Sequence, residues 1–286
     1  RQCVPRPSMP RMPADLPVNF RPDAFAGTVD DYVRYRPPYD ARMVSEILSR
    51  AALPAEGARL IDLACGPGRL TFAIAEHFAD GLAIDLEPKM IAAARLEAER
   101  RGVRHIHWSV GRAEDLEAPA GAFDLVTAAS AFHRFDQPRV AALAYRWLKP
   151  GGAFVTLGET PAMAARANWR SAVTDLVHAY VGEPVQRLQG APKPTPGEGL
   201  AHEEQVLRHA GFTPVESRSF ETPYAWTLES LLGYLRSTSF ASRAALGERH
   251  DAFEADLTAA LLAFDGSGRY PEIVGSGYTL ARKPSS

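Results

Sequence analysis

Hydrophobic positions in the middle of the chain follow two periods in turn. Five short apolar runs have the length of strands: 60–63, 81–86, 106–110, 123–129 and 153–157. Apolar residues at helical spacing fill most of the intervals between them. This regular alternation across residues 57–158 predicts a parallel, doubly wound α/β sheet.

Proline, glycine and polar residues mark where the helices should begin and end. A helix is expected from Asp40, because apolar residues share one face up to Ala51 before Pro54. Pro88 suits the first turn of a second helix, and Gly102 suits the position just past its end. A helix that opens at Pro138 should stop at the turn 149–152.

The pattern changes after residue 158. An amphipathic helix is expected over 169–180, a proline-rich hinge over 190–197, helical faces over 228–235 and 253–264, and late strands over 214–220 and 273–281. The late strands bring the total to seven, mostly parallel, with an inserted helical lid. Three regions follow: an extended or disordered arm at 1–27, a core with an N-terminal cap helix at 28–158, and the lid with the last strands at 159–286.

Composition narrows the class of partner. Lys plus Arg number 32 and Asp plus Glu 34, so the net charge of −2 provides no basic footprint for nucleic acid. Cys3 and Cys65 lie in unlike contexts, which argues against a disulfide framework. No apolar run reaches the roughly 18 residues of a spanning helix, and the start lacks a signal peptide. We expect a cytoplasmic protein that binds a small molecule and has no nucleic-acid or membrane partner.

The first strand leads into a loop that predicts a bound nucleoside. Asp62 stands near the end of the strand, and Gly66 and Gly68 remove side chains where backbone would approach a ligand. Asp85 follows Gly66 by 19 positions (85 minus 66), close to the distance at which an acid meets ribose hydroxyls. That geometry suits NAD, FAD and S-adenosylmethionine alike.

The loop itself favours one of these ligands. A dinucleotide fingerprint needs G-x-G-x-x-G or A, but Leu70 and Thr71 occupy the later positions here. Asp62 would also repel a phosphate, whereas it could receive an ammonium group. These features point to a nucleoside that carries an amino acid.

The segment 62–68 (DLACGPG) resembles motif I of the class I S-adenosylmethionine-dependent methyltransferases, a Rossmann-like family. Segments 111–116 (GRAEDL), 123–126 (FDLV) and 148–152 (LKPGG) resemble that family's adenine-side loop, fourth strand and following turn. The segment 32–37 (YVRYRP) is similar to small-molecule members of the methyltransferase type 11 or trans-aconitate methyltransferase type. The resemblance covers roughly residues 30–160.

The resemblance implies a role for each matching position. The cofactor-binding positions are Tyr32, Arg36, Asp62, Ala64, Gly66, Gly68, Asp85, Leu86, Met90, Arg112, Ala113, Glu114, Ala129 and Ser130. Gly66 and Gly68 would lie behind the methionine moiety and Asp85 would hold the ribose. Leu86 and Met90 would flank the adenine. Tyr32 and Arg36 would bind the cofactor carboxylate.

Two positions depart from the family pattern. Ala64 stands where the family has the first glycine of its loop, so the local backbone shape is in question. Arg134 stands where an aromatic is common, which changes the charge beside the acceptor.

His133 and Glu159 are the catalytic candidates. Both follow strands whose carboxyl ends face the expected methyl group, and either could accept a proton. His133 could equally order its loop, and Glu159 could begin the lid. A metal site is not expected, because His105 and His107 have no third ligand cluster nearby.

The sequence therefore predicts methyl transfer from S-adenosylmethionine to a small-molecule acceptor. Oxygen is slightly favoured over nitrogen or carbon, and the segment 129–132 lacks the Asn/Asp-Pro-Pro-Tyr pattern of enzymes acting on nucleobase or glutamine amides. Two alternatives are a non-catalytic S-adenosylmethionine-binding protein and a nicotinamide oxidoreductase.

Overall fold

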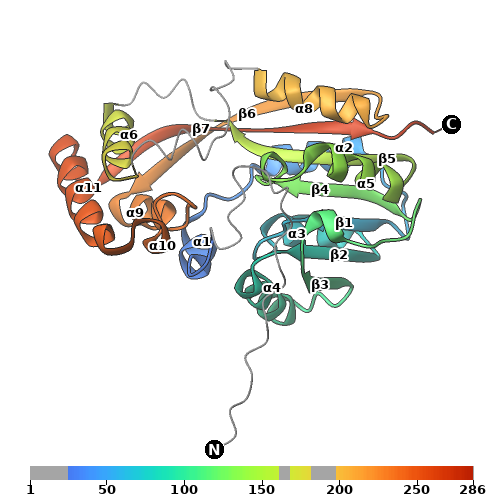
Figure 1. Ribbon diagram of the computed structural model, residues 1–286, viewed down its shortest axis with the longest axis horizontal. Helices are drawn as coiled ribbons and strands as arrows, with labels where there is room; N and C mark the ends of the chain where they lie inside the picture. Colours follow the sequence, from blue (N-terminus) through green and yellow to red (C-terminus); the bar gives the residue numbers. More distant parts are fainter. Residues whose placement is uncertain (1–24, 161–167, 182–197, 286) are drawn as a thin grey trace, which may run out of the picture.

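The computed structural model describes residues 25–160, 168–181 and 198–285 and contains one seven-stranded sheet (Figure 1). Its strand order is β3-β2-β1-β4-β5-β7-β6, and only β7 runs antiparallel to its neighbours. The strands are β1 (Arg59–Leu63), β2 (Asp80–Asp85), β3 (Ile106–Val110), β4 (Phe123–Ala129), β5 (Leu148–Thr160), β6 (Val215–Thr227) and β7 (Arg269–Arg282). The expected doubly wound, mostly parallel sheet is confirmed.

Helices cover both faces of this sheet. Those outside the lid are α1 (Val29–Tyr35), α2 (Ala41–Ala51), α3 (Arg69–Ile74), α4 (Pro88–Arg101), α5 (Gln137–Trp147) and α8 (Glu198–His209). Helices α5 and α8 pack into one hydrophobic core with Phe154, whereas α2 and α3 pack into another with Val155, its neighbour on β5. Successive strand residues point to opposite faces, so two cores follow from the alternation.

The predicted helix ends are confirmed. The Asp40 side chain accepts a hydrogen bond from the Arg42 backbone N–H, which caps α2. Pro88 is the first residue of α4, and Gly102 ends that helix with a left-handed φ of 71°.

The turn expected at 149–152 is wrong in one respect. These residues belong to β5, which begins at Leu148 directly after α5. The pairing with β4 shifts register between Phe123 and Leu125, and Gly151 adopts a φ of 79°. The segment expected as a separate turn is therefore an irregular stretch at the start of β5.

The last two strands extend well beyond the rest of the sheet. Strand β5 pairs with β7 only as far as Gly275, but β6 and β7 stay paired from there to Thr227 and Arg269. The helices α6 (Asn168–Val181), α9 (Leu228–Arg236), α10 (Arg243–Leu246) and α11 (His250–Phe264) gather at this far end (Figure 1). Because α9–α11 lie between β6 and β7 in sequence, the expected inserted helical subdomain is confirmed. We call these four helices the lid.

The lid has a core of its own, rich in aromatic rings. Trp169, Trp226, Phe253 and Tyr270 are all buried within it. The Trp226 indole N–H donates to the buried Glu272 carboxylate at 2.6 Å. This core is separate from those that cover the sheet.

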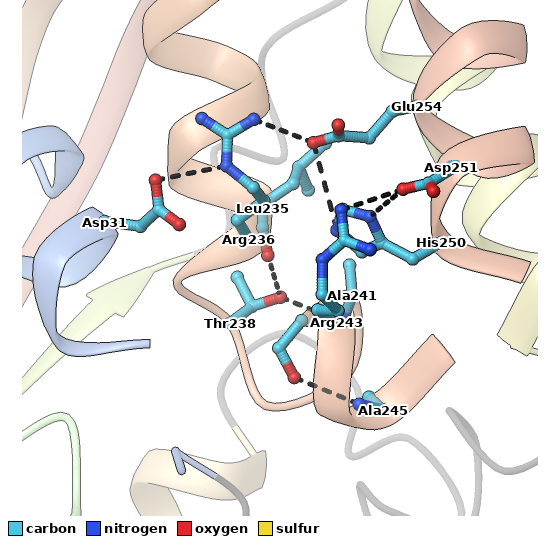
Figure 2. Close-up of polar contacts among 11 residues, drawn as sticks. Asp31, Leu235, Arg236, Thr238, Ala241, Arg243, Ala245, His250, Asp251 and Glu254 are labelled. Carbon is cyan, nitrogen blue, oxygen red and sulfur yellow. Dashed lines mark hydrogen bonds and ion pairs between the residues drawn. The ribbon is translucent and has the colours of Figure 1, made fainter. Parts of the chain in front are cut away.

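Helix α1 joins the lid to the glycine loop. Its Tyr35 ring fills the space above Gly233 of α9, where an added Cβ would come within 2.1 Å of the ring. Arg236 of α9 donates to Asp31 of α1 at 3.1 Å and to Glu254 of α11 at 2.7 Å (Figure 2). These contacts hold three helices together, and α1 belongs to the lid as much as to the sheet.

Two expectations fall at the limits of the described chain. The arm expected at 1–27 is described only from Phe25, where residues 25–27 form a turn before α1. The hinge expected at 190–197 lies outside the described residues. Among the residues that are described, no helix is both long enough and apolar enough to cross a membrane.

Candidate active site

The loop after β1 is held in an unusual backbone shape. Ala64, Gly66 and Gly68 have φ values of 50°, 56° and 83°, all in the left-handed region. The Cys65 N–H donates to the Ile84 carbonyl at 3.0 Å, which fixes the loop to β2. Ala64 adopts the conformation that glycine adopts most easily, so this departure from the family pattern is strained.

Asp85 is joined directly to this loop. One carboxylate oxygen accepts from the Gly66 N–H at 2.8 Å and the other accepts from the Glu87 N–H at 2.8 Å. Burial raises the pKa of Asp85, and these two backbone donors oppose that rise. Each oxygen keeps a lone pair, so the carboxylate is oriented and can still accept two hydroxyl donors.

Asp62 is completely buried beneath the loop. Its two oxygens accept from the hydroxyls of Thr71 and Thr127, the second at 2.7 Å. Burial raises the pKa of Asp62 to about 6, although both threonines lower it. The two threonines therefore already hold the carboxylate, and a ligand's ammonium group would feel its negative charge without touching it.

The two glycines of the loop lack side chains for different reasons. At Gly66 an added Cβ would meet only Cε1 of Tyr32, at 4.0 Å, so the backbone is open on the side of α1. At Gly68 an added Cβ would lie 2.7 Å from both Phe72 and Trp108. Internal packing accounts for the missing side chain at Gly68, which was expected to serve the approach of a ligand.

Aromatic side chains from the N-terminal part of the chain face the loop. Phe25 meets the Tyr32 ring edge to face, with 6.2 Å between the ring centroids. The Arg36 guanidinium lies 4.8 Å from the centre of the Tyr32 ring and donates to the Ser237 hydroxyl at 2.8 Å. The open backbone at Gly66, the oriented Asp85 carboxylate and the facing Tyr32 ring together suit a nucleoside.

The expected adenine side is largely internal. Met90 and Ala113 are buried, and Leu86 is partly buried. The Glu114 carboxylate accepts from the Asp136 N–H at 3.1 Å and lies 3.6 Å from the Arg112 guanidinium. Glu114 therefore anchors the start of α5, and Arg112 is its partner.

The segment after β4 holds the residues expected near the methyl group. Ala129 and Ser130 are partly buried; Ser130 has a left-handed φ of 52°, and its N–H donates to the Leu157 carbonyl at 2.7 Å. His133 lies on the short turn Phe132–Arg134, and its side chain is open to solvent. Although the residue is exposed, neighbouring protein removes enough water from the ring to lower the pKa of His133, and the Arg134 guanidinium lowers it further. The imidazole is therefore neutral at pH 7 and can accept a proton.

Glu159 is located only through its backbone. It pairs with Ser276 of β7 near the end of β5, on the side from which the lid extends. The position of its side chain lies outside the described part of the chain.

Two residues of this region were missed by sequence reasoning. Phe25 was assigned to the disordered arm because prolines surround it, and Ser237 lies 201 positions from its partner Arg36. No local sequence pattern predicts the contact of Phe25 with Tyr32 or that of Ser237 with Arg36. A single aromatic after a proline-rich stretch was the available signal for Phe25.

A hollow of about 1110 Å³ lies elsewhere, among α1, α2, α3 and α4. Its apolar lining includes Val33, Leu48, Phe72 and Leu96, and Arg36 is the only predicted site residue on it. The predicted residues converge at the strand ends and not in this hollow.

No group of three or more histidines, cysteines and carboxylates that could hold a metal occurs within the described ranges. His105 contacts the Ala75 carbonyl at 3.0 Å, and His107 lies 3.2 Å from Asp80. The two histidines therefore have separate partners.

Comparison with known proteins shows similarity to methyltransferases. Residues 60–152 match a family model described as a methyltransferase domain. The chain is 32% identical over 200 residues to nocamycin O-methyltransferase from Saccharothrix syringae, covering 63% of this chain and 69% of that protein. It is 38% identical over 125 residues to the ubiquinone biosynthesis O-methyltransferase of Xanthomonas campestris pv. campestris (strain B100), covering 42% of this chain but only 51% of that enzyme.

Solved structures share the fold at lower identity. Haemonchus contortus phosphoethanolamine N-methyltransferase 2, in complex with S-adenosyl-L-methionine, aligns with a TM-score of 0.55 and 17% identity, over 92% of this chain and 56% of that one. The [4+2]-cyclase SpnF aligns with a TM-score of 0.51 and 20% identity, over 88% of this chain and 85% of that one. These likenesses show the fold alone.

Proposed function

Because the chain belongs to the class I S-adenosylmethionine-dependent methyltransferases, we propose that it transfers the methyl group to an oxygen atom of a small-molecule acceptor. The observation that carries this proposal is the Asp85 carboxylate, which the Gly66 and Glu87 N–H groups orient, together with His133 on the short turn that follows β4. The family sets aside both alternatives, the non-catalytic binder and the nicotinamide oxidoreductase.

Asp85 holds the two ribose hydroxyls of the cofactor in this proposal. Its carboxylate is already oriented by two backbone donors, so little freedom is lost on binding. Leu86 and Met90 flank the adenine, with Ala113, Arg112 and Glu114 at its edge. These assignments rest on the resemblance.

The amino-acid end of the cofactor lies on the open backbone at Gly66, and Gly68 shapes the loop beside it. Asp62, held by two threonine hydroxyls, provides negative charge for the ammonium group. Tyr32 and Arg36 approach from α1 and bind the carboxylate, by a phenol hydroxyl and a guanidinium. Ala64 shapes the loop.

When the methyl group goes to a hydroxyl, His133 is the base that takes the hydroxyl proton. The sulfonium supplies an electrophilic methyl group, and the chain's task is to orient the acceptor oxygen in line with it. Ala129 and Ser130 border that space, and Glu159 at the end of β5 is the second candidate base. Burial and the neighbouring Arg134 guanidinium lower the pKa of His133, which favours its neutral form.

Two of the sequence relatives favour oxygen as the methylated atom. Nocamycin O-methyltransferase and the ubiquinone biosynthesis enzyme are both named as O-methyltransferases. The second alignment spans about half of that enzyme, so its acceptor is not transferred to this chain. Nitrogen and carbon acceptors are the competing outcomes of the test.

Methyl-labelled S-adenosylmethionine incubated with hydroxyl, amine and activated-carbon acceptors tests the proposal. We expect label on oxygen, and a loss of about 100-fold in kcat for His133→Gln with hydroxyl acceptors. The exposed His107→Gln on β3 is the matched control and should behave as wild type. Label found only on nitrogen or carbon, or full activity of His133→Gln, would contradict the proposal.

A further inference from the structure

Arg134 has an unusual environment for an arginine. It ends the short turn Phe132–Arg134, directly after His133, and it is partly buried. Its guanidinium lies 4.9 Å from the centre of the Phe25 ring. Within the described residues, this side chain makes no hydrogen bond and no ion pair.

Other arginines show how exceptional this is. Arg104, Arg146, Arg249 and Arg269 also lack polar side-chain partners in the described ranges, but all four are exposed to water. Partly buried arginines elsewhere, such as Arg59 and Arg236, are paired with carboxylates. A guanidinium that loses water without gaining an acceptor carries a desolvation cost, which an anionic ligand would remove.

The charges around Arg134 leave room for such an anion. Burial lowers the pKa of Arg134, and the Asp85 carboxylate opposes that change from a distance too long for an ion pair. His133, its neighbour, is neutral at pH 7. Asp85 keeps its charge when it accepts from ribose hydroxyls, but its oxygens are then occupied, and the cofactor's sulfonium adds positive charge to the same site.

The stacking on Phe25 also suits recognition. A guanidinium that lies over a ring uses its face for that contact and keeps its N–H edges free. Those edges match the two oxygens of a carboxylate. We propose that Arg134 determines acceptor specificity by binding a carboxylate, so that the methyl acceptor is a small organic acid.

This assignment rests on the proposed function, and binding to the protein saturated with S-adenosylhomocysteine tests it. The probes are benzoate, phenylacetate and succinate, each compared by calorimetry with its own amide. At least one acid should bind about 10-fold or more tightly than its amide, and that ratio should fall to near 1 in Arg134→Gln. Arg134→Lys should give an intermediate ratio, and Arg104→Gln, an exposed arginine, should match wild type.

Three results would overturn the assignment. One is an equal acid-to-amide ratio in wild type and Arg134→Gln, and another is no saturable binding of any acid. The third is a variant that binds S-adenosylhomocysteine weakly but methylthioadenosine normally, because Arg134 would then serve the cofactor carboxylate. Failure of wild type to bind S-adenosylhomocysteine would instead refute the proposed function, and a thermal melt of each variant excludes misfolding.

Discussion

The glycine loop and the lid are organised by different kinds of contact. In the loop, backbone N–H groups hold the acid Asp85, and the donors lie within 19 positions of it. In the lid, side chains hold one another across long separations, as Tyr35 and Glu229 do over 194 positions. The first arrangement is preorganised by local chain geometry, whereas the second depends on the whole tertiary structure.

This difference has a consequence for function. A cofactor shared by a whole family can be bound by backbone and a few invariant atom positions. An acceptor that differs between members needs side chains that can vary, and we propose Arg134 as one of them. Variants in the two regions should therefore fail in different ways.

Removing the Asp85 carboxylate should have the largest effect. Asp85→Ala deletes the proposed acceptor for two ribose hydroxyls and leaves the Gly66 and Glu87 N–H groups unpaired. Since hydrogen bonds to a charged group contribute about 1.5–3 kcal/mol each, we expect at least a 100-fold weaker affinity for S-adenosylhomocysteine by calorimetry. Glu248→Ala, at an exposed acid between α10 and α11, is the control and should bind normally. An unchanged affinity of Asp85→Ala would refute its assignment to the ribose.

Asp62 should couple stability to pH. Its folded pKa of about 6 exceeds the value of about 3.9 for an unfolded aspartate, so ionising it in the folded protein is unfavourable. The cost is absent below pH 4, grows between pH 4 and 6, and reaches at most about 3 kcal/mol above that. Asp62→Asn should therefore be more stable than wild type at pH 8 but not at pH 4, by chemical denaturation, while binding S-adenosylhomocysteine less tightly.

The exposed Asp175→Asn in the lid is the matched control for that experiment. It removes a carboxylate without removing a buried charge. A stability gain of Asp62→Asn that did not change with pH would contradict the role given to burial.

Filling the space at Gly233 should disturb the lid more than the loop. In Gly233→Ala the new Cβ would meet the Tyr35 ring, and overpacking of this kind costs about 1–3 kcal/mol. We expect a lower melting temperature and a raised KM for the acceptor, with a smaller change in cofactor affinity. Gly266→Ala, whose nearest contact would be an ordinary 3.9 Å, should have no such effect. Equal losses of acceptor and cofactor binding would show that the two regions are not separable.

The smallest effect should come from relieving the loop backbone. Ala64 has a φ of 50°, so Ala64→Gly should stabilise the protein by about 1 kcal/mol in denaturant unfolding. The reverse sign is expected for Ala92→Gly, at an exposed site within α4, where glycine costs about 1 kcal/mol. Destabilisation in both variants would argue against strain at Ala64.

The sequence predicted the glycine loop better than the lid, because contacts in the loop are local and contacts in the lid join residues far apart in the chain. Asp85, the loop glycines, and the caps at Asp40 and Gly102 follow from local spacing, and their positions agree with the structure. The missing side chain at Gly68 was explained wrongly, because Trp108 lies 40 positions away (108 minus 68) in sequence but beside it in space.

The sequence predicted the helices of the lid, but it did not predict which residues they contact. Hydrophobic spacing indicated α6, α9 and α11, yet it could not show that Tyr35 would sit against Gly233. Likewise, the stacking of Arg134 on Phe25 joins residues 109 positions apart (134 minus 25). Periodicity reports which face of an element is apolar, and it carries no information about the partner that covers the face.

The most direct test is a crystal structure of the complex with S-adenosylhomocysteine. The ribose hydroxyls are expected on the Asp85 carboxylate, the amino-acid end over Gly66, and the sulfur facing the segment of His133 and Arg134. A ligand bound instead in the hollow among α1, α2, α3 and α4, or bound without contact to Asp85, would contradict the account.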